Sequence, residues 1–286
     1  MKNILVTGAN GQLGNEMRLL ANDNREYNYY FTDIAELDIC NEAAVLSFVQ
    51  DNKIDIIVNC AAYTAVDKAE DNEELCNRLN NIAVGYLAKA VQTNNGSIIH
   101  VSTDYVFDGT NHIPYKETDS TCPNSVYGVT KLAGEEAVLR ECNNAMIIRT
   151  AWLYSPFGNN FVKTMIKLGT ERDSLGVIFD QIGTPTYARD LAVAIFAAIN
   201  KAIVPGRYHF SNEGVCSWYD FTKSIHRIAG INNCKVKPLH TEDYPSKAPR
   251  PNYSVLDKTK IKETYNIEIP HWEESLVDCI NELIKK

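Results

Sequence analysis

Two residues four positions apart, Tyr127 and Lys131, could perform acid–base chemistry. They fall in the segment 126–141, whose pattern predicts a helix, and residues four apart share one face of a helix. An ammonium beside a phenol favours the phenolate and lowers its pKa from about 10 toward the range of a general acid or base. With 15 tyrosines in the chain such pairs also arise by chance, and Tyr219 with Lys223 is a second one. The positions of the two pairs in the predicted fold distinguish them.

The Tyr127 pair lies at the start of the helix that precedes the fifth predicted strand, and Thr103 ends the fourth. The carboxyl ends of parallel strands meet at one edge of a sheet, so Thr103 and Tyr127 would face the same crevice. Tyr219 lies in the C-terminal part, remote from any such crevice, and we interpret its pair with Lys223 as a surface or packing pair. The sequence therefore predicts Thr103, Tyr127 and Lys131 as the catalytic group.

A glycine-rich turn after the first predicted strand could hold a dinucleotide. The run Gly8-Ala9-Asn10-Gly11-Gln12-Leu13-Gly14 follows an apolar strand and opens a helix, which is the context that a dinucleotide fingerprint requires. Glycines there allow a tight turn, a close backbone approach to a pyrophosphate and close helix–strand packing, and the helix N-terminus stabilises phosphate charge. The alternative is a turn that serves packing alone.

Asp33 ends the second predicted strand, where a carboxylate can accept hydrogen bonds from both hydroxyls of an adenosine ribose. A 2′-phosphate at this place would meet a like charge, and the glycine loop contains no Arg or Lys to compensate. We therefore predict NADH or NADPH as the cofactor, with NADH used at least as well as NADPH. An exposed turn carboxylate is the alternative for Asp33.

Short apolar runs alternate with helical patterns through the first half of the chain. Crossovers of a dozen or more residues between such runs predict parallel strands buried on both faces. The predicted fold is α/β, a Rossmann-type doubly wound parallel sheet with a smaller, intermittent C-terminal substrate domain. We assign residues 1–160, with a further strand and helix from about 182–204, to the dinucleotide-binding domain, and 161–181 with 205–286 mainly to the substrate domain. The runs are centred on residues 4–6, 29–31, 56–58, 98–101 and 146–148.

The composition of the 286-residue chain excludes several classes of protein. The formal net charge is −8 and no stripe of Lys and Arg occurs, which argues against nucleic-acid binding. No apolar run approaches the roughly 18 residues that a membrane helix needs, so we expect a cytoplasmic protein without membrane contact. The eight cysteines form no Cys-x-x-Cys pair and the six histidines show no ligand spacing. We therefore predict reduced thiols and no metal site.

Taken together, these residues resemble the extended short-chain dehydrogenase/reductase family. The resemblance begins with the GxxGxxG loop, a hydroxyl residue ending the fourth strand and Tyr-x-x-x-Lys. It is closer to the members that reduce the 4-keto group of a dTDP-linked 4-keto-6-deoxy sugar to give dTDP-L-rhamnose, and it runs through nearly the whole chain. The segments that carry this closer likeness are 64–70, 102–109, 126–131, 158–161, 180–186 and, more weakly, Arg250-Pro251 with Ser254.

The resemblance implies a role for each site residue. Tyr127 would donate a proton to the keto oxygen, Lys131 would hold the cofactor ribose and tune Tyr127, and Thr103 would donate a hydrogen bond to the carbonyl. With the residues derived above, the cofactor-binding set is Gly8, Gly11, Gln12, Leu13, Gly14, Asp33, Asp38, Ile39, Ala62, Tyr63, Thr64, Tyr127 and Lys131. The substrate-binding set is Thr103, Asp104, Tyr105, Trp152, Asn160 and Arg250. Arg250 is the candidate for neutralising the pyrophosphate. The alternatives are a core aromatic for Trp152 and an exposed loop residue for Arg250.

Three other functions remain open. Sister enzymes that eliminate water have Asp-Glu after the strand-four threonine, and Asp104-Tyr105 stands there in this chain, which argues against a dehydratase. A sugar-nucleotide 4-epimerase would share Thr103, Tyr127 and Lys131 but would retain NAD tightly and consume none. A non-catalytic nucleotide-binding regulatory subunit, resembling that of methionine adenosyltransferase, would use the fold to bind a partner enzyme.

One position departs from the pattern that the resemblance implies. Some members of the reductase family pair subunits through a metal held by glutamates, and Glu16 could match one of those ligands. Arg189 occupies another such position, where its cation would repel a metal. We therefore expect no structural Mg²⁺ and a monomer or weak homodimer.

Overall fold

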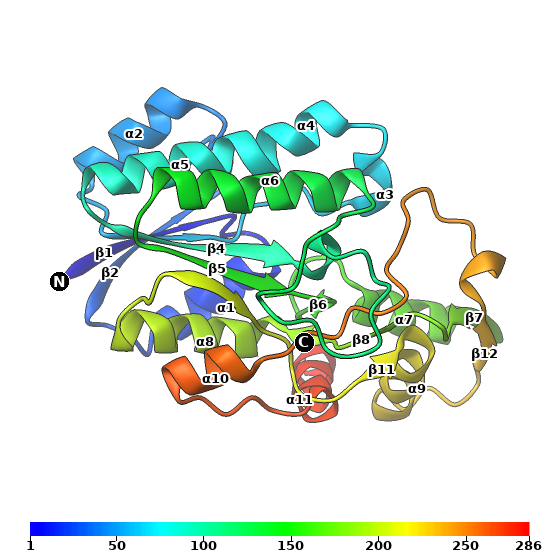
Figure 1. Ribbon diagram of the computed structural model, residues 1–286. Helices are drawn as coiled ribbons and strands as arrows, with labels where there is room; N and C mark the ends of the chain where they lie inside the picture. Colours follow the sequence, from blue (N-terminus) through cyan, green and yellow to red (C-terminus); the bar gives the residue numbers. More distant parts are fainter. Residues whose placement is uncertain (286) are drawn as a thin grey trace.

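The central sheet of the computed structural model, which describes residues 1–285, holds six parallel strands in the order β2-β1-β3-β4-β5-β10 (Figure 1). It confirms the predicted doubly wound sheet. The strands are β1 (Lys2–Thr7), β2 (Tyr27–Thr32), β3 (Ile56–Asn59), β4 (Ser97–Thr103), β5 (Ala145–Thr150) and β10 (Gly206–His209).

The strand order reverses direction between β1 and β3. From β1 the chain adds β2 on one side and then returns to place β3, β4, β5 and β10 on the other. Connections therefore leave β1 and β3 in opposite directions, which opens a crevice at the carboxyl ends of these strands. Thr7 of β1 pairs with Asn59 of β3 at this edge.

Helices cover both faces of the sheet because successive strand residues point to opposite sides. Ile4 and Val6 belong to the core shared with α1 (Gln12–Ala21) and α8 (Ala188–Lys201), whereas Leu5 belongs to the core on the other face. That second core packs under α2 (Glu42–Asp51), α5 (Ala83–Thr93) and α6 (Val126–Glu141), and Figure 1 shows these three helices side by side.

The helical stretch between β3 and the end of α5 is interrupted. It contains α3 (Val66–Ala69), α4 (Glu73–Asn77) and a single π-helical turn, η1 (Arg78–Ile82), that leads directly into α5. A π turn inserts an extra residue into a helix and often occurs at functional sites. Hydrophobic periodicity does not report such an insertion.

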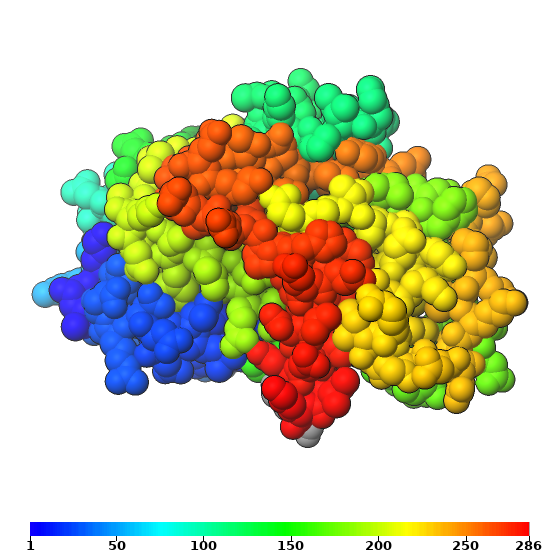
Figure 2. Space-filling model, turned by 90° about the horizontal axis from the view of Figure 1, so that it is seen from below, coloured from blue at the N-terminus to red at the C-terminus, as the bar shows by residue number. Residues whose placement is uncertain are grey.

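The remaining elements form a second core beside the sheet. Three two-stranded sheets pair β6 (Leu153–Tyr154) with β9 (Thr186–Tyr187), β8 (Ile182–Gly183) with β11 (Cys216–Ser217), and β7 (Ser174–Ile178) with β12 (Lys235–Leu239). The helices of this part are α7 (Phe161–Glu171), α9 (Trp218–Ile228) and α11 (Trp272–Ile284), whereas α10 (Thr259–Tyr265) packs in the core that α8 shares with the sheet. The short turns are η2 (Asp104–Val106) and η3 (Thr241–Asp243). Figure 2 shows α11, in red, with α8, in lime, and the blue N-terminal segments on one side and α9, in gold, on the other.

Two details differ from the expected segment boundaries. The strands within 182–204 pair with β11 and β6 instead of joining the main sheet, and the main sheet is completed by β10, which we had placed in the smaller part. β10 joins the main sheet because of partners that are distant in the sequence: Arg207 of β10 pairs with the buried Glu135 of α6, and Tyr208 packs in the sheet core. The division into two domains stays a prediction. In residues 1–285 no helix is both long and apolar enough to cross a membrane.

Candidate active site

The N-terminus of α6 packs directly on the end of β4. The Ser125 hydroxyl caps the helix by accepting from Gly128 N at 3.2 Å, and Glu70 accepts from Val126 N at 2.9 Å. A Cβ at Gly128 would lie 2.3 Å from the Tyr105 carbonyl oxygen, so a glycine is needed for this approach. The close contact brings Tyr127 to the carboxyl end of β4.

There the side chain of Tyr127 makes a hydrogen bond with Thr103. The ring of Tyr105 stands edge-on to that of Tyr127, with centroids 5.5 Å apart. Lys131 lies one turn further along the helix and is 1% exposed. The structure thus brings together Thr103, Tyr127 and Lys131, the residues that the sequence predicted as the catalytic group.

The pKa of Tyr127 moves in the opposite direction from our expectation. Burial of the hydroxyl raises this pKa, and the contact with the Thr103 hydroxyl opposes the shift only in part. Lys131 does not lower it: its amino group donates to the Val101 carbonyl at 2.7 Å and lies 3.4 Å from His100 Nε2. The phenol therefore keeps its proton at neutral pH, which is the state that a proton donor needs.

Lys131 itself has a depressed pKa. Burial lowers it to about 8, and the Glu135 carboxylate opposes this shift. Glu135 accepts from Ser102 at 2.6 Å, from Arg149 at 2.7 and 2.8 Å and from Arg207 at 3.1 Å. Because two arginines already balance its charge, Glu135 is no dedicated partner for the Lys131 ammonium.

Asp104 is a buried carboxyl beside the phenol. The Thr103 hydroxyl donates to its Oδ1 at 3.0 Å and accepts from Tyr105 N at 3.2 Å. Burial raises the pKa of Asp104 to about 6, and hydrogen bonds from Ser254 and Thr103 act against this rise. Near neutral pH a small change in its surroundings can therefore change the charge of this group.

A groove of about 340 Å³ opens at the carboxyl ends of β1, β2 and β3. Six predicted cofactor residues line it: Gly8, Gly11, Asp33, Asp38, Ile39 and Ala62. The other lining residues are Thr7, Thr32, Ile34, Leu37, Cys60, Ala61 and Leu79. Leu79 belongs to the π turn, which explains why its place in the groove was missed from the sequence. Among residues 1–285, no Lys or Arg lines the groove.

Two positions of the glycine turn have no space for a side chain. Gly8 has φ +64°, and a Cβ there would lie 2.7 Å from Ala61 N. A Cβ at Gly14 would lie 2.4 Å from the Gly8 carbonyl oxygen. Glycines at these positions therefore let the turn pack closely against the segment after β3 and against the start of α1, where Gln12 and Leu13 begin the helix.

Asp33 connects the glycine turn to the end of β2. Its Oδ2 accepts from Asn10 N at 3.0 Å and its Oδ1 from Ile34 N at 2.9 Å. Glu36 accepts from Asp33 N at 2.8 Å and adds a second carboxylate at this end of the groove. Two negative charges here disfavour a further phosphate.

Asn80, at the centre of the π turn, is a site residue that we missed. It is 0% exposed, and its amide accepts from Tyr63 N at 2.8 Å and donates to Tyr63 O at 3.1 Å. The same amide contacts Thr130 of α6 at 3.3 Å. Asn80 thereby fixes the segment Ala62–Thr64 against the catalytic helix. No signal in the sequence pointed to it, because residues 73–82 are largely polar and several of them are exposed.

Trp152 follows β5 with φ +49°, a left-handed conformation that is uncommon for a large residue. Its ring stacks on Trp218 with centroids 3.5 Å apart and an interplanar angle of 11°. A Cβ at Gly183 would lie 2.7 Å from the Trp152 ring, so that neighbour must stay small. The segment around Trp218 therefore lies closer to the crevice than we expected, while Tyr219 packs on the second core.

Asn160 connects the start of α7 to the start of α1. Its side-chain amide donates to Gln12 Oε1 at 2.9 Å and to Ser155 O at 2.7 Å, and its oxygen caps α7 by accepting from Lys163 N. The amide is thus committed to protein partners. Asn160 thus supports the start of α1, and its role as a substrate contact stays a prediction.

Arg250 is half-buried and not a free loop residue. Its guanidinium pairs with Asp67 at 2.5 Å and donates to the Tyr105 hydroxyl at 3.2 Å. Asp67 also accepts from Ala248 N at 3.2 Å. The segment around Arg250 is thereby held beside α3 and the end of β4, next to the ring that contacts Tyr127.

Arg189 lies between two carboxylates on different parts of the fold. Its Nε is 3.8 Å from Glu16 Oε2 of α1, and its other end pairs with Glu282 of α11. Ser155 also donates to Glu16, at 2.7 Å. Across the described residues, no group of three or more His, Cys, Asp and Glu side chains could hold a metal ion. The expectation of no metal site stays a prediction.

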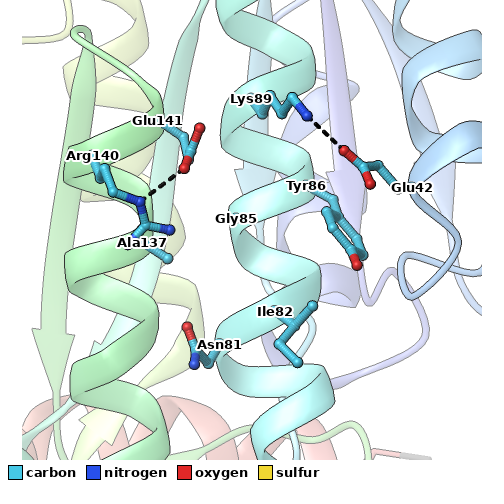
Figure 3. A pocket seen from close by; sticks show the side chains of 9 residues that line it. All are labelled: Glu42, Asn81, Ile82, Gly85, Tyr86, Lys89, Ala137, Arg140 and Glu141. Carbon is cyan, nitrogen blue, oxygen red and sulfur yellow. Dashed lines mark hydrogen bonds and ion pairs between the residues drawn. The ribbon is translucent and has the colours of Figure 1, made fainter.

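A second hollow, of about 360 Å³, lies on the outer helical face (Figure 3). It lies along α5, between α2 and α6. Figure 3 shows that α5 and α6 have small residues, Gly85 and Ala137, where they face each other. The ion pairs Lys89–Glu42 and Arg140–Glu141, both at 2.8 Å, border it. None of the predicted site residues lines this hollow, which separates it from the crevice.

Comparison with known proteins gives consistent matches over the full length. The family model for the RmlD substrate binding domain matches residues 1–285. A curated relative, dTDP-4-dehydrorhamnose reductase of Aggregatibacter actinomycetemcomitans, is 43% identical over 286 residues that cover 96% of this chain and 97% of the relative.

Two solved structures are similar to this one. A crystal structure of a dTDP-4-dehydrorhamnose reductase from Clostridium acetobutylicum has a TM-score of 0.94 and 44% identity, and covers 99% of each chain. That of dTDP-4-dehydrorhamnose reductase from Bacillus anthracis, in complex with NADP, has a TM-score of 0.95 and 41% identity, and covers 99% of this chain and 100% of the other.

Proposed function

This chain belongs to the RmlD substrate binding domain family and is an NAD(P)H-dependent oxidoreductase, and on that premise we propose that it reduces the 4-keto group of dTDP-4-dehydro-L-rhamnose to dTDP-L-rhamnose. The observation that carries the proposal is the hydrogen bond between Thr103 and Tyr127 at the carboxyl end of β4. β4 pairs with β3, and residues that directly follow β3 line the glycine groove. Such an arrangement suits a carbonyl that is reduced next to a nicotinamide.

In this proposal two hydroxyls act on the carbonyl oxygen. A bound nicotinamide supplies hydride. Tyr127, whose pKa is raised by burial, holds its proton until the oxygen gains negative charge and then donates it. Thr103 donates a hydrogen bond to the same oxygen and stabilises the developing charge. Tyr105 stands where an eliminating enzyme needs a second carboxylate, which supports reduction over dehydration.

The cofactor would be held by the glycine turn and the first residues of α1. Gly8 and Gly11 line the groove beside the start of α1, where the pyrophosphate would bind, and Asp33 would accept from the adenosine ribose. Because Asp33 and Glu36 are both acidic, NADH should be used at least as well as NADPH. Paired titrations with the two nucleotides test this, and a preference of roughly a hundredfold for NADPH would contradict it.

The sugar nucleotide would lie on the side of Trp152 and Arg250. The guanidinium of Arg250 is a bidentate donor suited to a pyrophosphate, and its pairing with Asp67 keeps it oriented beside Tyr105. Asp104 and the exposed part of Trp152 would contact the sugar.

The decisive assay follows NADH consumption with the dTDP-linked keto sugar formed by an upstream dehydratase and epimerase. We expect one NADH oxidised per sugar reduced, with the product identified by chromatography and NMR. Tightly retained NAD without net consumption would instead indicate a 4-epimerase. Co-purification of a larger enzyme, with no turnover of any dTDP-linked keto sugar, would indicate a regulatory subunit.

We also propose that the protein needs no Mg²⁺ and is a monomer or weak homodimer. The Arg189 cation between Glu16 and Glu282 supports this, because it already balances carboxylates that a metal would require. Incubation with EDTA should leave both the activity and the solution mass unchanged. Loss of either on chelation would contradict the proposal.

A further inference from the structure

A line of buried polar side chains runs across the sheet from β1 to the catalytic helix. Thr7 of β1 donates to Asn59 Oδ1 of β3 at 2.6 Å, Asn59 Nδ2 lies 3.0 Å from His100 Nδ1 of β4, and His100 Nε2 lies 3.4 Å from Lys131 Nζ. Each of these four side chains is at most 1% exposed. None of the roles assigned above uses His100.

The backbone fixes the orientation of the Asn59 amide. Ala61 N donates to Asn59 Oδ1 at 3.2 Å, and the Thr7 hydroxyl donates to the same atom. The amide nitrogen must therefore face His100, where it donates to Nδ1. Because Nδ1 accepts, a neutral His100 ring carries its hydrogen on Nε2, the atom that faces Lys131.

An Nε2–H opposite an ammonium would place two donors against each other. The contact is satisfied when the Lys131 amine is neutral, since its lone pair can then accept from Nε2–H while its own N–H donates to Val101 O at 2.7 Å. Burial and the nearby lysine keep the pKa of His100 well below its usual value, so the ring stays neutral. The arrangement therefore favours the uncharged form of Lys131.

The other titratable groups around Lys131 act in the opposite direction. Glu135, one turn further along α6, and Cys76, from α4, favour the charged lysine. Glu135 is already paired with Arg149 and Arg207, which limits this influence. Tyr127 lies one turn earlier on α6. His100 is thus the group on β4 that opposes the charge of Lys131.

We propose that His100 is a positioning residue that acts through Lys131: held in one tautomer by Asn59, it donates to the neutral amine and lets Lys131 exchange its proton near neutral pH instead of remaining a fixed cation. This inference rests on the proposed role of Lys131 in the reaction. It also ties the catalytic helix to Asn59 and Thr7, at the edge of the cofactor groove.

The first test reads the tautomer without any activity. A long-range ¹H–¹⁵N spectrum of histidine-labelled protein should show a neutral His100 with its hydrogen on Nε2 across the pH range in which the fold is stable. The signal is assigned by its loss in His100→Asn. A hydrogen on Nδ1, or a ring that becomes charged between pH 6 and 8, would overturn the proposal.

The second test reads the protonation of Lys131. In His100→Asn the new amide oxygen can still accept from Asn59 Nδ2, but the shorter side chain provides no donor that could contact the Lys131 amine. Lysine labelled with ¹³C at Cε, assigned by Lys131→Arg, should titrate near pH 8 in the parent protein and roughly one pH unit higher in His100→Asn. The alkaline limb of kcat/KM should move by the same amount.

His209→Asn is the matched control. His209 is also fully buried on this sheet, and its ring faces the Tyr115 carbonyl instead of Lys131. It should lower stability without moving the lysine titration. Equal titrations in His100→Asn and the parent protein, or equal shifts in both histidine variants, would overturn the proposal. If Tyr127→Phe kept its turnover, the proposed reaction would fail while the two NMR tests would still decide the role of His100.

Discussion

The two walls of the crevice are built in different ways. The cofactor wall is made by the ends of neighbouring strands of one sheet, and its glycine turn, Asp33 and Thr103 follow those strands directly along the chain. The substrate wall is assembled from two-stranded sheets and loops that meet only in three dimensions. Asn160 bonds Gln12 across 148 positions, and Arg250 pairs with Asp67 across 183. A wall of the first kind can be predicted from local sequence, and a wall of the second kind depends on distant partners.

The largest effect that we expect is on the cofactor wall. Tyr127→Phe removes the proton donor and should lower kcat at least about a hundredfold. The fold should be kept, because the ring still contacts Tyr105. Steady-state assays and NADH titration measure the two effects. A Phe variant with most of its turnover and normal cofactor binding would refute the role of Tyr127.

The second effect is on stability and depends on pH. Asp104 has a folded pKa of about 6, above its ordinary 3.8, so the folded state binds its proton more tightly than the unfolded state. The stabilisation of the fold by protonated Asp104 is complete below pH 3.8. It is lost as the pH rises through 6, because the wild type then carries a buried negative charge. Relative to wild type, Asp104→Asn should therefore gain up to roughly 3 kcal/mol between pH 4 and pH 8.

Urea denaturation of both proteins at several pH values measures this difference. The Thr103 hydroxyl can still donate to the Asn oxygen, so the local hydrogen bond is kept. A stability difference that does not change with pH would show that Asp104 ionises normally in the folded protein.

The third prediction crosses from one wall to the other. Asn160→Ala removes the cap of α7 and frees Gln12, so we expect about 1 kcal/mol less stability and about a fivefold higher KM for NADH. Ser217→Ala is the control, because Ser217 caps α9 in the same way without touching the glycine turn. It should lose similar stability and keep the KM for NADH. A raised KM for the sugar nucleotide alone would instead support Asn160 as a substrate contact.

The smallest effect concerns the stacked tryptophans. Trp218→Leu keeps apolar volume but loses the stack on Trp152, which should raise the KM of the sugar nucleotide about threefold and leave that of NADH unchanged. Trp218→Phe, which keeps a ring against Trp152, should resemble the parent protein. Equal KM values in all three proteins would mean that Trp152 is positioned by its backbone alone.

Local patterns predicted much of the fold. The helices Gln12–Ala21 and Val126–Glu141 begin and end where their periodicity placed them, because each has one apolar face or a clear cap. β10 was assigned to the smaller part because it is short and half polar, and its place in the sheet depends on Arg207 reaching Glu135. Pairings of this kind leave no periodic signal.

The same distinction holds for the site. Strand ends and a Tyr-x-x-x-Lys spacing predicted where Thr103, Tyr127 and Lys131 would meet. The pKa shifts of Tyr127 and Lys131 could not be predicted in this way, because burial is the largest cause of both. Burial is a property of the packed molecule, which spacing along one helix does not contain.

The π turn at Arg78–Ile82 carries a consequence for how this enzyme could change over time. Losing one residue there would turn the segment into an ordinary helix, with better backbone geometry. The same deletion would rotate Asn80 by about a quarter of a turn, away from Tyr63. A chain selected for thermal stability alone could lose that residue. A chain that must keep Asn80 against Tyr63 has to retain the less regular π turn.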